Sequence, residues 1–175
     1  KNAERHRDNP EFQQDMLATV ENSLEKMRQM MLQLREGQAP ADGAAFGVEL
    51  EPILRRIQQS ARRRGREVGL RSVERIATRG HEQRLERVIE HIVQNALDAT
   101  PASGSVSVEL ERVGARVRLK VRDSGAGMTQ EFIQTRLFRP FSSTKASGMG
   151  IGSYEALQYL RQIGGAIEVE SEVGK

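Results

Sequence analysis

The stretch Val121-Arg122-Asp123-Ser124-Gly125-Ala126-Gly127-Met128 places a carboxylate where an apolar run ends and two closely spaced glycines begin. A carboxylate held in an apolar pocket can accept a hydrogen bond from an exocyclic amine, and this contact distinguishes adenine from guanine. Glycines at positions 125 and 127 would let the backbone approach a flat ring closely. The same residues are also common in ordinary turns, so this stretch alone leaves both interpretations open.

A second group of polar residues lies on the strongest helical pattern in the chain, residues 82–100. At about 100° per residue, Asn95 falls at the edge of the buried stripe, and His91 and Asp98 lie beside it on the same edge. An amide oxygen there can coordinate a hard cation such as Mg²⁺, which prefers oxygen ligands. On this helix alone, an asparagine that makes only local hydrogen bonds is an equally valid interpretation.

A third group is the run Gly148-Met149-Gly150-Ile151-Gly152, which opens a helical pattern. A glycine loop at a helix start offers free N–H groups and the positive end of the helix dipole to phosphates. Thr144, Lys145 and Ser147 precede the run, and the lysine can add a point charge beside a terminal phosphate. The run fits neither the Walker A loop nor the dinucleotide fingerprint, and by itself it is also compatible with a flexible surface loop.

These three groups follow one another within about 60 residues, and the patterns around them predict the elements that position them. Period-two runs at 106–110 and 117–121 predict an antiparallel pair of strands. Further predicted elements are a strand at 46–50, helices at 52–61, 129–137 and 151–163, a loop at 138–149 and a last strand at 166–169. Helices mixed with antiparallel strands predict an α+β fold, built as a two-layer α/β sandwich.

The N-terminal part of the chain has a different pattern. Apolar residues recur at spacings of four and three and predict a helix that ends at Gly37 and needs a helical partner: Phe12, Met16, Val20, Leu24, Met27, Met31 and Leu34. Residues 37–45 are rich in small residues and read as a linker. We therefore predict a helical segment at 1–36, a linker at 37–45 and a separate domain at 46–175.

Composition excludes several classes of function. The chain has 27 Lys and Arg against 24 Asp and Glu, a net charge of only +3, which is a weak indication of nucleic-acid binding. It contains no cysteine, so disulfides, thiolate metal sites and thiol catalysis are excluded. The basic cluster at residues 62–66 is interpreted as a solvated helix end, with phosphate binding as the alternative. We expect no nucleic-acid partner.

Four motifs in order, HIVQNALDAT, DSGAGM, RLFRPFSSTK and SGMGIG, resemble the N, G1, F and G2 boxes of the GHKL ATP-binding superfamily. Within it, residues 46–175 resemble the catalytic domain of bacterial sensor histidine kinases, which implies the Bergerat ATP-binding fold with ATP and Mg²⁺ as ligands. The resemblance implies that Asn95 holds Mg²⁺ and that Asp123 binds the adenine amine. It also implies further nucleotide or lid residues, namely Asp98, Gly125, Gly127, Met128, Phe138, Phe141, Thr144, Lys145, Ser147, Gly148, Met149, Gly150, Ile151 and Gly152.

The same resemblance implies a role in two-component signalling. Residues 1–36 are similar to the second helix of a dimerisation and histidine-phosphotransfer hairpin, which implies a homodimer through the N-terminal helices. The implied partner is the receiver domain of a response regulator, and the implied location is cytoplasmic, with membrane attachment only through upstream segments. The stretches NAERHRDNPEFQQDML and QLREG resemble PrsK-type, PEP-CTERM-associated kinases.

Two departures from the family pattern limit the interpretation. His91 stands where relatives commonly carry a second Asn and where the ATP-hydrolysing branch carries a water-activating Glu. Contact with phosphate-side water or magnesium and a structural role both remain open. No histidine fits the acceptor pattern of His followed by Asp or Glu on the first hairpin helix, because Arg7 follows His6, His81 precedes the N-box helix and His91 lies inside it. We expect the acceptor upstream of residue 1, which makes this chain a fragment. The alternatives are a GHKL-type ATPase and a basic nucleic-acid-binding module.

Overall fold

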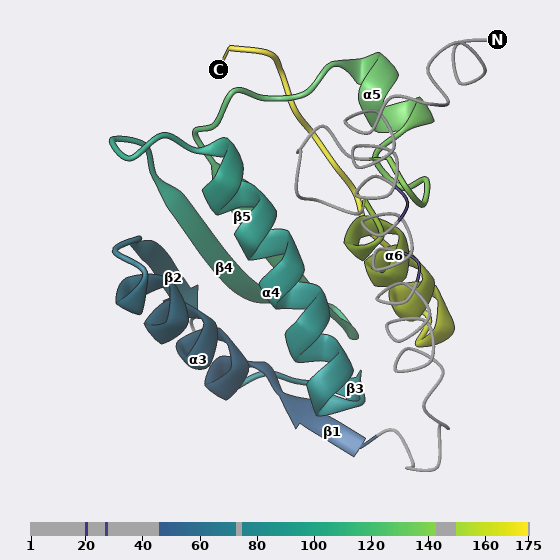
Figure 1. Ribbon diagram of the computed structural model, residues 1–175. Coiled ribbons are helices and arrows are strands. Elements are labelled where there is room, and N and C mark those ends of the chain that lie inside the picture. The colour runs from purple at the N-terminus through teal and green to yellow at the C-terminus, as the bar shows by residue number, and fades with distance from the viewer. Residues whose placement is uncertain (1–19, 21–26, 28–45, 73–74, 143–149, 175) are drawn as a thin grey trace, which may run out of the picture. The chain divides into compact units, whose positions relative to one another are not determined.

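The computed structural model describes residues 20, 27, 46–72, 75–142 and 150–174 (Figure 1). The chain divides into two units, residues 1–42 and 43–175. Val20 and Met27 are helical and exposed, whereas the rest of the N-terminal stripe and the linker lie outside the described residues. The dimerisation segment and its boundary therefore remain predictions.

The described strands of the larger unit form two sheets. β1 (Phe46–Glu49) pairs antiparallel with β3 (Ala77–Gly80). β4 (Val106–Val113) pairs antiparallel with β5 (Arg116–Asp123) and parallel with β2 (Val68–Ser72), so β4 is the middle strand of the order β2-β4-β5. The predicted antiparallel pair is confirmed, and β2 and β3 are additions that sequence patterns did not reveal.

Helices cover one face of the larger sheet (Figure 1). α3 (Leu50–Arg63) and α4 (Glu82–Ala99) each bury one apolar stripe, as expected for amphipathic helices that lie on a sheet. α5 (Gln130–Thr135) is short and has no buried residue, whereas α6 (Gly152–Gln162) buries Ala156 and Tyr159. The layer of helices over a layer of strands confirms the predicted two-layer α/β sandwich.

The core lies between these layers. The largest side chains that are almost fully shielded from solvent come from α3, the β2–β3 connection, α4 and β4, and they are Ile53, Ile76, Val93, Val108 and Leu110. Packing from both layers fixes α4 firmly against the sheet, and α4 carries the N-box residues. None of the described helices is long and apolar enough to cross a membrane.

The last predicted strand, residues 166–169, is wrong. These residues form neither helix nor strand, and Ile167 packs partly against the core. The segment that follows makes its hydrogen bonds to the glycine corner after β5: the Met128 N–H donates to Ser171 Oγ (2.9 Å) and the Gly174 N–H donates to the Ala126 carbonyl (3.1 Å). An alternating pattern fits a strand, but it does not determine whether the segment pairs with a neighbouring strand.

Candidate functional site

α4 and α6 lie side by side and run antiparallel, as residue contacts along both helices show (Figure 1). The Arg84 guanidinium carbon lies 4.3 Å from the centroid of the Tyr159 ring, and one helical turn further along α4 Arg87 forms an ion pair with Glu155 (3.3 Å). A further turn along, His91 faces the first residue of α6. The next turn of α4 therefore extends past the start of α6.

His91 and Asn95 are in contact on adjacent turns of α4. The Asn95 Nδ2 atom lies 2.9 Å from His91 Nε2, and both side chains are half-buried. Gly152 closes the other side of the imidazole, because three ring atoms, Cε1, Nδ1 and Nε2, occupy the space that a β-carbon at position 152 would need. The N-box helix thus meets the start of α6 through an imidazole packed directly against a glycine.

The C-terminal end of α4 meets the glycine corner that follows β5. The Ala126 N–H donates to the Ala99 carbonyl oxygen at 3.3 Å, and a β-carbon at Gly125 would lie 2.7 Å from that same oxygen. The Gly125 N–H donates to Asp123 Oδ1 at 3.0 Å, which fixes the carboxylate at the corner. Glycine at 125 is therefore required by packing against α4.

The surroundings of Asp123 differ from the sequence expectation. Its side chain is exposed, whereas a carboxylate in an apolar pocket was predicted. Gly127 adopts a φ of +72°, and a β-carbon there would collide with the Glu172 backbone. Met128, which follows, is half-buried beneath the same C-terminal segment.

Ser142 of the F box and Gly150 of the G2 box are in contact. Gly150 adopts a φ of +66°, and a β-carbon on it would lie 2.6 Å from the backbone N, C and O of Ser142. Ile151 is buried at the N-cap of α6, and its apolar side chain makes no capping hydrogen bond. Thr144, Lys145, Ser147, Gly148 and Met149 lie outside the described residues, so their predicted phosphate contacts stay predictions.

The two phenylalanines of the F box differ in burial. Phe138 is half-buried, but Phe141 is 62% exposed and has a φ of +64°, which is unfavourable for a bulky residue. Phe141 therefore does not pack into the described part of the domain, and the lid role that the resemblance implies for both phenylalanines stays a prediction.

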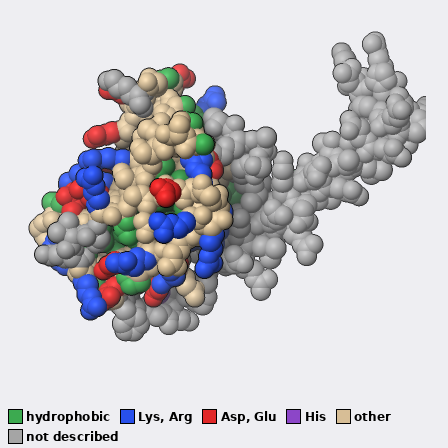
Figure 2. All heavy atoms as spheres, turned by 90° about the vertical axis from the view of Figure 1, so that its left-hand side faces the viewer, with side chains coloured by type: hydrophobic (Ala, Val, Ile, Leu, Met, Phe, Trp, Pro, Cys, Tyr) green, Lys and Arg blue, Asp and Glu red, His purple; other side chains and the backbone are tan. Residues whose placement is uncertain are grey.

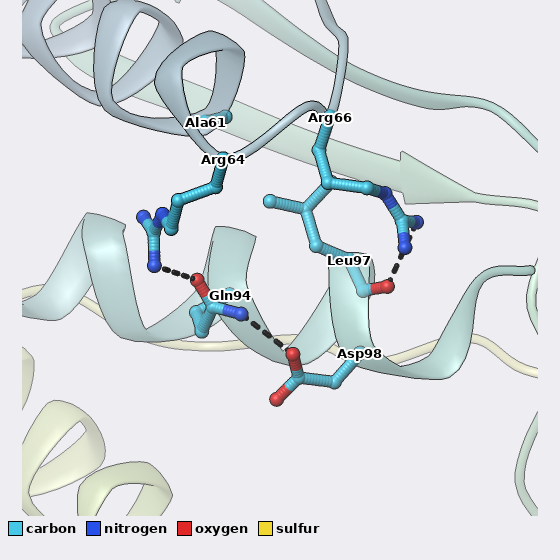
Figure 3. A pocket seen from close by; sticks show the side chains of 6 residues that line it. All are labelled: Ala61, Arg64, Arg66, Gln94, Leu97 and Asp98. Carbon is cyan, nitrogen blue, oxygen red and sulfur yellow. Dashed lines mark hydrogen bonds between the residues drawn. The ribbon is translucent and has the colours of Figure 1, made fainter. Parts of the chain in front are cut away.

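Asp98 lies with residues that face α3. A depression of about 340 Å³ between α3 and α4 is lined by Ala61, Arg64, Arg66, Gln94, Leu97 and Asp98 (Figure 3). Arg64 donates to Gln94 Oε1 (2.8 Å), Gln94 donates to Asp98 Oδ1 (2.5 Å), and Arg66 donates to the Leu97 and Thr100 carbonyls (2.9 and 2.8 Å). These bonds join the end of α3 to the end of α4. They favour a structural role for Arg64 and Arg66 over phosphate binding.

Charges elsewhere on the unit are mixed. Basic and acidic side chains intermingle over the face drawn in Figure 2. On the open side of the sheet, Lys120 and Arg118 both contact Glu111, at 3.3 and 3.4 Å. On the α3 side, hydrogen bonds from Arg56 lower the pKa of Glu86 below its ordinary value. The described residues also contain no cluster of three or more acidic or histidine side chains arranged to hold a metal.

Sequence reasoning missed three residues that shape this region. Ser142 meets Gly150, Ser171 accepts from Met128, and the buried Tyr159 hydroxyl accepts from the His81 N–H at 2.7 Å. Serines carry no local signal for such contacts. Tyr159 lies in the helix predicted at 151–163, and a tyrosine hydroxyl that is buried usually has a hydrogen-bond partner. That requirement is the one sequence signal that could have indicated the contact with His81.

The arrangement is suited to an elongated anionic ligand. With about 1.5 Å of rise per residue, the His91 and Ala99 contacts lie roughly 12 Å apart along α4, comparable with the reach of an extended nucleoside triphosphate. Gly152 and the uncapped start of α6 lie at one end, Asp123 and Gly125 lie at the other, and Asn95 lies between them. The available groups, an amide oxygen, backbone N–H groups and a carboxylate, match a metal, phosphates and an amine.

Comparison with known proteins identifies relatives of this arrangement. Residues 80–175 match the profile of the family described as histidine kinase-, DNA gyrase B-, and HSP90-like ATPase. The sensor histidine kinase ZraS of Klebsiella oxytoca is 40% identical over 93 residues, which cover 53% of this chain and 20% of ZraS. The chain spans about a fifth of the length of such curated relatives.

Solved structures are similar over more of the chain. Full-length ShkA in complex with AMPPNP aligns with a TM-score of 0.66 at 24% identity, covering 83% of this chain and 32% of ShkA. The histidine kinase ThkA in complex with the response regulator TrrA aligns with a TM-score of 0.62 at 19% identity, covering 94% of this chain and 48% of that one. At these identities the likeness establishes the fold.

Proposed function

Because the chain belongs to the family of histidine kinase-, DNA gyrase B- and HSP90-like ATPases, we propose that residues 46–175 form the ATP-binding catalytic domain of a two-component sensor histidine kinase. The observation that carries this proposal is the arrangement along α4. The helix aligns the start of α6, Asn95 and the Asp123 corner in one row, which matches phosphates, metal and base in that order.

The base end is the corner at Asp123. The hydrogen bond from Gly125 fixes one carboxylate oxygen, and Gly125 itself is held against the end of α4. A carboxylate accepts from the exocyclic amine of adenine, whereas guanine presents a carbonyl oxygen at the equivalent position. We therefore assign base selection to Asp123, with Gly125, Gly127 and Met128 forming the adjoining backbone.

The metal end is Asn95. Mg²⁺ binds in proteins through one or two protein oxygens, with phosphate oxygens and waters completing an octahedron, so a single amide oxygen is a sufficient protein contribution. The donor set fits, since the Asn95 amide turns its nitrogen toward His91 and so offers its oxygen on the other side. Bound magnesium would neutralise part of the triphosphate charge.

The phosphate end is the start of α6. Its uncapped backbone N–H groups and the positive helix terminus would hold phosphate oxygens. In the reaction, a nitrogen of the acceptor imidazole forms a bond to the γ-phosphorus as the bond to the ADP oxygen breaks, and ADP leaves. The domain's contribution is positioning and charge stabilisation, which is the main requirement in phosphoryl transfer.

The wider assignments belong to this proposal as well. ThkA, a structural relative, is seen with a response regulator, and a receiver domain is the corresponding partner proposed for this protein. Homodimerisation through the N-terminal helices, an acceptor histidine outside residues 46–175 and a PrsK-type assignment rest on sequence resemblance. His91 in place of a water-activating Glu favours transfer to histidine over a hydrolysing ATPase.

The test is nucleotide affinity in an Asp123→Asn variant. Exchanging a charged acceptor for a neutral one should weaken ATP binding about 10- to 100-fold, since hydrogen bonds to charged groups contribute about 1.5–3 kcal/mol. Titration calorimetry with ATP and GTP measures the loss and its base dependence. Glu109→Gln, a carboxylate change on the open side of β4, is the matched control. Unchanged ATP affinity in Asp123→Asn would remove the base assignment.

A second readout separates the kinase from an ATPase. With γ-labelled ATP, this chain should bind nucleotide without acquiring acid-labile label, and a version extended through the complete phosphotransfer hairpin should acquire it. Stable labelling of His6, His81 or His91 would contradict the location of the acceptor. Rapid release of inorganic phosphate without any labelled histidine would favour the ATPase.

A further inference from the structure

The contact between His91 and Asn95 places an amide nitrogen against a ring nitrogen. The Nδ2 atom of an asparagine amide carries two hydrogens and has no lone pair to offer, so it can only donate. In this arrangement His91 Nε2, 2.9 Å away, accepts, which corresponds to the tautomer with the ring proton on Nδ1. With its nitrogen toward His91, the Asn95 amide turns its oxygen to the opposite side.

The imidazole is itself held in place. Gly152 packs against the ring edge formed by Cε1, Nδ1 and Nε2, and no β-carbon could be accommodated there without displacing the ring. Gly152 also begins α6, the helix whose N-terminus faces the proposed phosphate position. His91 thus contacts both the proposed metal ligand and the helix that would hold the phosphates.

We propose that His91 is a positioning residue that sets the orientation of the Asn95 amide, so that its oxygen faces the magnesium of bound Mg²⁺-ATP. The proposal rests on the proposed function, and it assigns His91 neither proton transfer nor phosphoryl acceptance. Partners that orient a metal ligand without touching the metal typically contribute about 10- to 100-fold in metal affinity. Gly152 is the second part of this device, because only glycine leaves room for the ring.

The functional test compares ATP affinity with and without magnesium. His91→Leu keeps a side chain of similar bulk but removes the acceptor, so the magnesium-dependent gain in ATP affinity should fall about 10- to 100-fold. His91→Gln supplies an amide oxygen that accepts from Asn95, and it should retain most of the gain. If His91→Leu keeps the full magnesium-dependent gain, the proposal is overturned.

Gly152→Ala tests the glycine contact. A β-carbon there displaces the imidazole, so this variant should lose the magnesium-dependent gain as His91→Leu does. Gly47→Ala is the matched control, because the nearest atom to its new β-carbon is 3.9 Å away. Equal magnesium dependence in the two glycine variants would overturn the role of Gly152 and, with it, the clamped imidazole.

A spectroscopic measurement on the unmodified, nucleotide-free chain is independent of ATP binding. Nitrogen NMR of the histidine rings should show His91 with Nε2 unprotonated and Nδ1 protonated, and a coupling across the hydrogen bond should connect Nε2 to the Asn95 amide. A proton on Nε2 would overturn the inference even if ATP binds as proposed. If ATP does not bind at all, the proposed function fails. The NMR measurement still tests the hydrogen bond between His91 and Asn95, because it uses the nucleotide-free chain.

Discussion

Gly150 offers a quantitative test of how the start of α6 is built. Its φ of +66° lies in the left-handed region, where an L-residue costs about 1–2 kcal/mol. A β-carbon would also lie 2.6 Å from three backbone atoms of Ser142, and backbone cannot rotate away as a flexible side chain can. Overpacking of this kind costs about 1–3 kcal/mol. Gly150→Ala should therefore cost about 2–5 kcal/mol in total.

The control separates the two parts of this cost. Gly114, in the turn between β4 and β5, has a φ of +59°, and a β-carbon added there would have no other atom within 4 Å. Gly114→Ala should therefore show only the conformational part, about 1–2 kcal/mol, in the free energy of unfolding measured with urea. The excess in Gly150→Ala measures the contact with Ser142.

The same pair of variants reports on nucleotide binding. The Gly150→Ala variant can relieve the collision by moving residue 150 away from Ser142. ATP binding must then restore the original arrangement and its overpacking, which costs about 1–3 kcal/mol, so ATP affinity should be about 5- to 150-fold weaker. Gly114 is remote from the proposed site, so ATP affinity in Gly114→Ala should not change. Identical unfolding energies and identical ATP affinities in the two variants would refute the reasoning.

Two further predictions concern stability. Tyr159→Phe removes the hydroxyl that accepts from the His81 N–H, and leaving that donor unsatisfied should cost about 1–3 kcal/mol in urea unfolding; a change within error would mean that another acceptor replaces it. The second prediction concerns Glu86, whose pKa is lowered by hydrogen bonds from Arg56. Its contribution to the free energy of unfolding is therefore present at neutral pH. That contribution is lost as the pH falls below the ordinary carboxyl value of 4.5 and through the lowered pKa. Glu86→Gln should therefore lose at most about 0.5–1 kcal/mol at neutral pH, because the pair is partly exposed, and its unfolding curve should merge with that of the unmodified chain in acid. A gap that persists in acid would contradict this cause.

Sequence patterns were informative where the structure depends on local periodicity. The stripe of α4 correctly put His91 and Asn95 on one edge, because residues four apart on a helix are neighbours, and the structure brings them into hydrogen-bonding contact. The β4–β5 pair followed from alternation together with a turn at Gly114. Each of these features joins residues that are close in sequence.

Features that depend on distant partners could not be predicted in this way. β2 pairs with β4 in parallel, at the far side of two other elements, and its five residues include a glycine that weakens the strand pattern. Residues 166–169 alternate as a strand does but stay unpaired. The packing of His91 against Gly152 joins residues about 60 positions apart. From the sequence alone, a bound ligand had been the suggested reason for a glycine at position 152.

That last case changes how the glycines of the site should be interpreted. Gly152 makes room for His91, and Gly125 makes room for the Ala99 carbonyl, so both are required by contacts within the protein before any nucleotide binds. Loss of binding in a glycine variant would therefore not distinguish a ligand contact from a displaced helix. Asp123→Asn preserves shape and alters one polar atom, so it keeps the contact of Gly125 with the Ala99 carbonyl intact. Such an exchange can assign the base end of the row along α4.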